Sequence, residues 1–398
     1  MRRIFSVICI AAGLGLSIGC ADDRLPFPDL DPDLEAEFRE WVSEHAASPE
    51  DYVLSKFTDH DIVFLGEYHR IRHDALLIQD LIPLLYPAGI RTLGIEFAAA
   101  ADQADIDRLL AAEHFDQGLA NQVFWNLWPW WGFQEYVDIL HAAWQLNREL
   151  PPDAPPFRVV GLNARMDWSH VWSPEDRNDP EVMKQVFPDG DSDEVMARTI
   201  RREILAKGEK ALIYSGINHA YTRFHQPVYD VEKGELVRSV TGRMGNRTYA
   251  EIGDRAFVIF LHSPWPSVTG YGDPFVYPAE GVIDALFATL PPDERRVGFD
   301  IKDSPFGQLS ATDSYWSHAA EDFRLDMYCD GWIYQRPLSQ YDGVTVIEGW
   351  INEENRLEAI AQIANPDPRV KDRARTVEDL TTMLAEDTDF KRRFARFR

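Results

Sequence analysis

Two short motifs bring ionisable side chains to the ends of apolar runs. DIVFLGEYH (61–69) places a carboxylate and an imidazole directly after Gly66, and KALIYSGINH (210–219) places His219 three residues after Gly216. In an extended chain, residues two apart face the same way, so Glu67 and His69 can act on one group. A histidine beside a carboxylate can activate water as a general base or bind a divalent metal.

The surrounding elements explain how these residues could meet. Short apolar runs typical of buried parallel strands occupy 61–66, 91–97, 157–163, 210–216 and 256–261. Helical patterns lie at 34–46, 75–86, 135–150 and 195–207, and Pro83 is expected to kink or end the second of them. This alternation predicts an α/β fold, a mainly parallel sheet flanked by helices on both faces. The site is expected at the C-terminal ends of the strands.

Four residues are therefore expected at one edge of the sheet: Glu67, His69, Glu96 and His219. Two imidazoles and two carboxylates suit Zn, Mn or Co. They suit equally a metal-free acid/base set in which His69 activates water and a carboxylate orients it. A lone loop histidine is usually unremarkable in function. The repeated Gly-x-x-His after two buried-type strands favours a shared catalytic or metal site.

Further candidates flank the first motif. Arg70 could hold a carboxylate or an oxyanion, although a surface basic residue is the simpler interpretation. If the segment is helical, His69 and His73 share a face, and His73 is a ligand or substrate contact or merely part of a solvated helix start.

Other pocket candidates lie farther along the chain. FWNLWPWWGFQEY (124–136) holds four tryptophans, which form either a substrate-facing wall or packing against the sheet. Trp131 belongs to this run, and Glu135 could orient a site residue. Tyr221 and Arg223 follow His219 and could line the pocket, and a tyrosine there could ligate haem iron.

The N-terminus predicts export. Residues 1–19 have two arginines followed by an apolar stretch and small residues, as in a signal peptide, and Cys20 resembles the lipidated first residue of a bacterial lipoprotein. We expect a linker at 20–33, a single domain at 34–365 and a charged helical tail at 366–398. The expected location is the outer membrane, facing the periplasm or the cell surface, with membrane contact through the lipid anchor only.

The amino-acid composition of the chain limits the classes of partner that it is expected to bind. The chain has 66 acidic and 40 basic residues, a net charge of −26, which disfavours nucleic acid. After export only Cys329 would be a free cysteine, so internal disulfides are not expected. A small-molecule or peptide substrate is the expected partner.

The motifs GEYH, GIEF and GINH, in this order, resemble the superfamily that groups erythromycin esterases, TIKI proteases and ChaN haem-binding lipoproteins. WGFQEYVDILHAAWQLN, DEVMARTI and DGWIYQRPLS extend the resemblance over about residues 50–350. It implies an α/β fold, with metal-dependent peptidases, lactone hydrolases using the first-motif histidine as base, and haem binders as its branches. Asn163 departs from the aspartate of the esterase branch, and Asp167 is a substitute candidate.

The sequence leads to a first hypothesis, an exported, lipid-anchored hydrolase of an amide, ester or lactone. Its water is activated by a metal or by His69. The alternative is a non-enzymatic haem- or metal-binding lipoprotein. A third, less favoured hypothesis is a binding module that keeps the fold without turnover.

Overall fold

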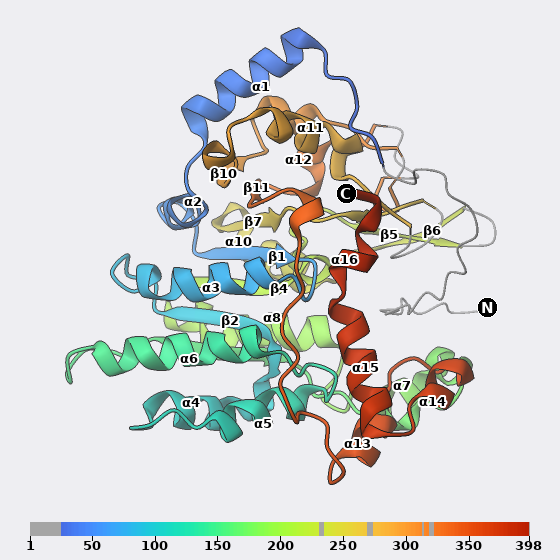
Figure 1. Cartoon of the computed structure of the whole chain (residues 1–398). Coiled ribbons are helices and arrows are strands. Elements are labelled where there is room, and N and C mark those ends of the chain that lie inside the picture. Colours follow the sequence, from blue (N-terminus) through green and yellow to red (C-terminus); the bar gives the residue numbers. More distant parts are fainter. Residues whose placement is uncertain (1–24, 231–234, 269–273, 313, 318–321, 398) are drawn as a thin grey trace. The chain divides into compact units, whose positions relative to one another are not determined.

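The computed structural model describes residues 25–397 except 231–234, 269–273, 313 and 318–321. The predicted signal peptide and Cys20 lie outside the described residues. Within the described ranges, no helix is both long and apolar enough to cross a membrane. Figure 1 shows the chain coloured from its N-terminus to its C-terminus.

The predicted fold class is confirmed. The main sheet has seven strands in the order β10-β11-β7-β1-β4-β2-β3. The pairs β11–β7, β7–β1, β4–β2 and β2–β3 are parallel, whereas β10 runs antiparallel to β11. Helices pack against this sheet, as the alternation of apolar runs and helical patterns predicts.

The chain divides into two compact units. One comprises Ala75–Tyr214 and Gly343–Asp389. Its strands are β2 (Thr92–Ala99), β3 (Arg158–Asn163) and β4 (Ala211–Gly216), the last of which ends just beyond the boundary of the unit. Its helices are most of α3 (Arg72–Leu85), α4 (Gln103–Ala111), α5 (Gln117–Leu127), α6 (Gln134–Glu149), α7 (Pro180–Val186), α8 (Ser192–Glu203), α13 (Arg356–Ala361), α14 (Pro368–Arg373) and α15 (Val377–Thr388).

The other unit comprises residues 25–74, Ser215–Asp342 and the chain from Phe390 onward. Its sheet strands are β1 (Ile62–Glu67), β7 (Ala256–Leu261), β10 (Val297–Asp300) and β11 (Gly331–Tyr334). Two hairpins, β5 (Gln226–Asp230) with β6 (Glu235–Val240) and β8 (Trp265–Pro266) with β9 (Phe275–Val276), accompany them. The helices are α1 (Pro32–His45), α2 (Pro49–Lys56), α9 (Ile217–Ala220), α10 (Met244–Ile252), α11 (Val282–Thr289), α12 (Leu325–Tyr328) and α16 (Phe390–Arg393).

The predicted strands and helices correspond to observed ones within a few residues. The helix predicted at 75–86 is α3, which begins earlier, at Arg72. Pro83 stands in its last turn, and the helix ends two residues later. Asp191 caps the start of α8, because its side chain accepts a hydrogen bond from the amide of Glu194.

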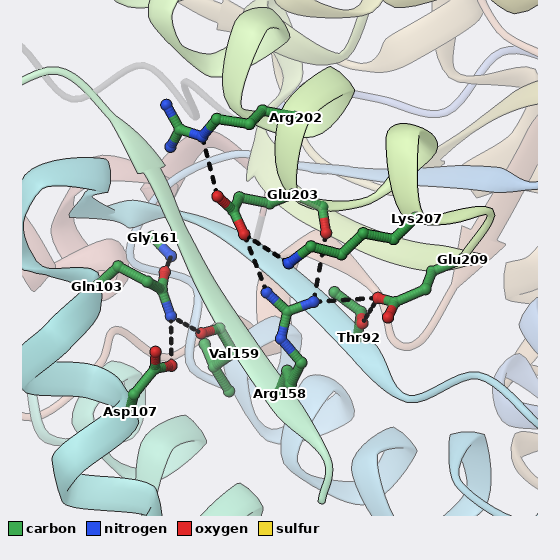
Figure 2. Close-up of polar contacts among 10 residues, drawn as sticks. All are labelled: Thr92, Gln103, Asp107, Arg158, Val159, Gly161, Arg202, Glu203, Lys207 and Glu209. Carbon is green, nitrogen blue, oxygen red and sulfur yellow. Dashed lines mark hydrogen bonds and ion pairs between the residues drawn. The ribbon is translucent and has the colours of Figure 1, made fainter. Parts of the chain in front are cut away.

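Polar side chains secure β3, the last strand in the sheet order. Figure 2 shows Gln103 of α4 donating to the carbonyl of Val159 and accepting from the amide of Gly161, at 2.9 and 3.0 Å. A side-chain amide thus occupies backbone groups that an edge strand would otherwise expose. At the start of β3, Arg158 donates to Glu203 and Glu209. These contacts join the amino end of β3 to α8 and the turn that follows it.

Candidate functional site

Gly66 allows β1 to approach the ring of Phe260 and the backbone of α9 closely. A Cβ atom built on it would lie 2.6 Å from the ring of Phe260 and 3.2 Å from the Cα of Ile217 in α9. Real Cβ contacts are not that short, so a glycine is required by this close approach. The β1 strand therefore packs directly beneath the helix that carries His219.

Glu67 and His69 form a dyad. The Nδ1 atom of His69 lies 2.9 Å from Oε1 of Glu67. The Glu67 side chain is fully buried, whereas 32% of the His69 side chain is exposed. An ionised carboxylate only accepts hydrogen bonds, so with Glu67 ionised the proton of His69 sits on Nδ1. The lone pair then lies on Nε2 of a side chain that solvent can reach, which is the arrangement of an oriented general base.

The residues after His69 form a bend. Arg70 is buried and has a φ of 73°, in the left-handed region that residues other than glycine rarely adopt. Because α3 begins at Arg72, the helical condition under which His69 and His73 would share a face is not met. The bend separates the two histidines into different local structures.

His73 and Asp74, in the first turn of α3, are buried ionisable groups. Burial holds the pKa of His73 well below its usual range, with the positive charge of Arg336 adding to the effect. Burial likewise holds the pKa of Asp74 well above its usual range, and the negative charge of Glu67 acts in the same direction. Gln335 donates to Asp74 at 2.8 Å. His73 is therefore a buried core residue rather than part of a solvated helix start.

His219 lies buried in α9, directly after β4. Tyr221, predicted to line the pocket, is also buried, and its ring contacts Phe260 and Tyr328 with centroids 5.6 and 5.5 Å apart. A tyrosine enclosed in this way does not fit the role of a haem ligand. Arg223 pairs with Asp330 instead of pointing freely into solvent.

Arg223 also lines a cavity of about 770 Å³. Aromatic and charged side chains surround this cavity, among them Tyr229, Tyr249, Lys302, Trp316 and Arg324. Its size falls within the range of small-molecule pockets. All of these lining residues belong to the unit that holds Glu67 and His69.

In the other unit, Glu96 is a buried residue of β2. Trp131 is buried and stacks on Phe97 with ring centroids 5.0 Å apart and planes 7° apart. The carboxylate of Glu135 accepts hydrogen bonds from the amide and hydroxyl of Thr345, at 2.7 and 2.9 Å. Trp131 and Glu135 thus have packing and bonding roles within this unit.

The neighbouring tryptophans also have packing and hydrogen-bonding roles. Their indole nitrogens donate to the segment that contains α13: Trp125 to Glu358, Trp128 to Gln362 and Trp130 to Ala359. Of the two interpretations of this run, packing is the one these contacts support. Asn163, the departure from the esterase pattern, bonds the amide of Ala164.

Glu67, His69 and His219 belong to one unit and Glu96 to the other, and the predicted four-residue metal centre stays a prediction. Across the part of the chain that the structure describes, no three His, Cys, Asp or Glu side chains are arranged to hold a metal ion. The Nδ1 atom of His69 is already engaged by Glu67. The dyad can support acid/base chemistry by the side chains themselves.

The structure also contains a buried histidine–carboxylate pair that the sequence analysis did not predict. His262 follows β7 directly, and its Nε2 lies 3.0 Å from Oδ1 of Asp284 in α11. The indole of Trp332 can only donate, and it does so to Nδ1 of His262 at 3.3 Å, so Nε2 carries the proton. The signal was present in the sequence, because AFVIFLH repeats the pattern of a buried strand followed by histidine. Both side chains are almost fully buried, which indicates a structural role.

Comparison with known proteins finds one family model that matches part of the chain. Residues 53–168 match the family model described as "Haem-binding uptake, Tiki superfamily, ChaN". Over this segment the chain is similar to the Tiki/ChaN superfamily. The Tiki/ChaN match includes Glu67, His69, Glu96 and Glu135, and the superfamily includes hydrolases and haem-binding proteins. The predicted resemblance is therefore confirmed.

Several solved structures are similar to this chain at low sequence identity. A Bacillus cereus protein is 11% identical, with a TM-score of 0.50, and the match covers 79% of this chain and 99% of that one. An erythromycin esterase mutant in its open conformation is 12% identical, with a TM-score of 0.45 and coverage of 71% and 91%. ChaN of Campylobacter jejuni, in a structure of cofacial haem binding, is 13% identical, with a TM-score of 0.37 and coverage of 56% and 90%. No curated protein matches the chain.

Proposed function

We propose that this protein is a hydrolase of an ester, lactone or amide bond, with His69 as general base and Glu67 as the residue that orients it. The observation that carries the proposal is the 2.9 Å contact between a buried carboxylate and a partly exposed imidazole. Similarity to a superfamily that includes hydrolases supports it. We further propose, from the N-terminal sequence, that the protein is exported and lipid-anchored.

The chemistry follows from the dyad. Nε2 of His69 would take a proton from water as the water oxygen attacks the carbonyl carbon, and the same proton would then pass to the departing oxygen or nitrogen. Glu67 would hold the ring in one tautomer and stabilise the imidazolium that forms. General-base catalysis of this kind typically contributes about 10²- to 10⁴-fold to the rate.

The test uses a chromogenic ester, p-nitrophenyl acetate, with the purified protein. We expect His69→Ala to lower kcat/KM by about 10²-fold or more, since the base is lost. Glu67→Gln should lower it less, because the ring remains but is no longer oriented by a charge. His114→Ala replaces an exposed histidine and serves as the matched control.

Two results would contradict the proposal. Equal hydrolysis by the wild-type protein and the His69→Ala variant would remove His69 from the mechanism. A Soret band on haem titration, together with no hydrolysis of ester, lactone or amide probes, would instead support the haem-binding alternative suggested by the family.

A further inference from the structure

The end of the chain is part of a core, although its sequence is dominated by charge. Three of its aromatic residues, Phe390, Phe394 and Phe397, are buried in one hydrophobic cluster. The other buried members of this cluster are Ile71, Phe275, Tyr277, Leu338 and Tyr341, and Tyr68 and Leu25 pack against it. Two of these residues, Tyr68 and Ile71, flank His69 in the sequence.

Tyr68 is held by several contacts from the C-terminal segment. A guanidinium nitrogen of Arg393 donates to its hydroxyl at 2.6 Å, and the guanidinium carbon lies 5.7 Å from its ring centroid. Its ring also meets those of Phe390 and Phe394 edge-on, with centroids 6.2 and 6.0 Å apart. Edge-to-face aromatic pairs and a cation over a ring are both favourable and directional.

The other side of the bend is held as well. The Ile71 side chain is fully buried in the same cluster, and the amide of Arg72 donates to the carbonyl of Asp342 at 3.0 Å. Between these anchors Arg70 keeps its left-handed φ of 73°. A residue persists in this sparsely populated region only where the surrounding structure determines its conformation.

These contacts leave His69 as the partly exposed residue of a bend whose neighbours point into a core. Tyr68 and Ile71 are fixed by the cluster, and Glu67 is fixed by β1. The direction of the His69 ring, and with it the contact to Glu67, depends on these anchors. The last residues of the chain supply much of the Tyr68 anchor.

We propose that four residues of the C-terminal segment, Phe390, Arg393, Phe394 and Phe397, position His69, with Arg393 as the principal positioning residue. It acts through Tyr68, which it holds by a hydrogen bond and a cation–π contact. The catalytic part of this inference rests on the proposed function. The structural part, that the segment fixes the bend at 68–72, stands independently of any activity.

The test compares Arg393→Ala with Lys391→Ala. Lys391 is an exposed cation on the same helix, 3.6 Å from Asp342, and is the matched control. We expect hydrogen–deuterium exchange of the amides at 68–72 to rise at least tenfold in Arg393→Ala, because the bend opens locally. Hydrolysis of p-nitrophenyl acetate should show kcat reduced about tenfold with KM nearly unchanged. Lys391→Ala should change neither quantity.

Two milder variants separate positioning from general stability. Arg393→Lys keeps a cation that can reach the tyrosine hydroxyl and should recover most of the protection and of kcat. Tyr68→Phe keeps the ring and loses the hydroxyl, so it should give an intermediate rise in exchange. A stability defect alone would raise exchange across β1 and β7 as well.

Unchanged exchange at 68–72 in a folded Arg393→Ala protein would overturn the inference. Raised exchange with an unchanged kcat would overturn the catalytic part. If the wild-type protein hydrolyses no probe, the proposed function fails, and the exchange experiment alone decides whether the segment fixes the bend.

Discussion

At the scale of single residues, the dyad shows how burial assigns roles. Glu67 and His69 differ in exposure because Glu67 is the last residue of a buried strand and His69 stands outside it. The buried carboxylate contacts the Nδ1 atom of the histidine, and the imidazole is partly exposed to solvent. Asp74 lies in the first turn of α3. Its burial and the negative charge of Glu67 raise the pKa of its carboxyl group, which favours the neutral form.

Gly66 gives the first prediction. Gly66→Ala should lower the free energy of unfolding by about 1–3 kcal/mol, because the new methyl group overlaps the ring of Phe260 and the backbone of Ile217. Urea unfolding followed by circular dichroism measures the change. Gly118→Ala is the control, since Gly118 is an exposed residue of α5 where alanine should cost little. An equal effect of both substitutions would contradict the close approach of β1 and α9.

At the scale of elements, the polar network at the start of β3 stabilises one unit. Glu203, the last residue of α8, bonds Lys207, Arg202 and Arg158 (Figure 2). The hydrogen bond from Lys207, followed by that from Arg202, lowers the pKa of Glu203 from 4.5 to about 2. The carboxylate is therefore favoured in the folded protein relative to the unfolded chain.

This pKa shift predicts a pH dependence. The contribution of Glu203 is fully present above about pH 4.5 and is lost as the pH falls towards 2. Glu203→Gln should lower the free energy of unfolding at pH 7 by about 1 kcal/mol, since water screens partly exposed ion pairs. The difference from wild type should shrink by pH 3.5.

Urea unfolding at the two pH values measures this effect, because urea does not add salt that would screen the charges. Glu181→Gln provides the control, since Glu181 and its partner Lys184 are largely exposed. A Glu203→Gln difference that grew towards acid pH would contradict the assigned sign.

The helices also show what local sequence rules do and do not predict. Pro83 stands in the last turn of α3, and the helix ends two residues after it, in line with the expectation that the proline would kink or end the helix. Three of the four tryptophans at 125–131 bond to a distant segment of the chain, and the fourth, Trp131, stacks on Phe97. Composition alone could not distinguish that role from a substrate wall.

At the scale of the whole molecule, the two compact units are each built from segments that are far apart in the sequence. Residues 366–397 contain α14, α15 and α16, and the buried phenylalanines from Phe390 onward belong to the core of the unit that contains Glu67 and His69. The segment FKRRFARF contains, among its charged residues, a Phe-x-x-x-Phe-x-x-Phe spacing. This spacing is the pattern of one buried helical face.

Cys329 provides a probe of global stability. It is a buried free cysteine, and burial raises the pKa of its thiol, with the negative charge of Asp330 adding to this effect. Since the thiolate is the reactive form, iodoacetamide should not label it in native buffer and should label it fully in urea. Mass spectrometry of the peptide containing Cys329 measures the labelling. Native labelling at the rate of a free cysteine would contradict the packing around it.

The sequence by itself determined the fold class, the main strands and the Glu67–His69 pair, because these depend on local patterns of apolar residues and on spacing within one strand end. It also carried the family resemblance. Export, lipidation and the absence of nucleic-acid partners stay predictions from the sequence.

Only the tertiary structure decided which predicted residues are buried, and which segment holds the bend after His69. Those features depend on contacts between residues hundreds of positions apart, such as Tyr68 with Arg393, and no local pattern encodes such a pairing. His262 also has its partner in another element, since Asp284 lies 22 residues later in α11. Burial and pairing set the charge state of each group, so the chemistry of the site depends on the three-dimensional arrangement as much as on residue type.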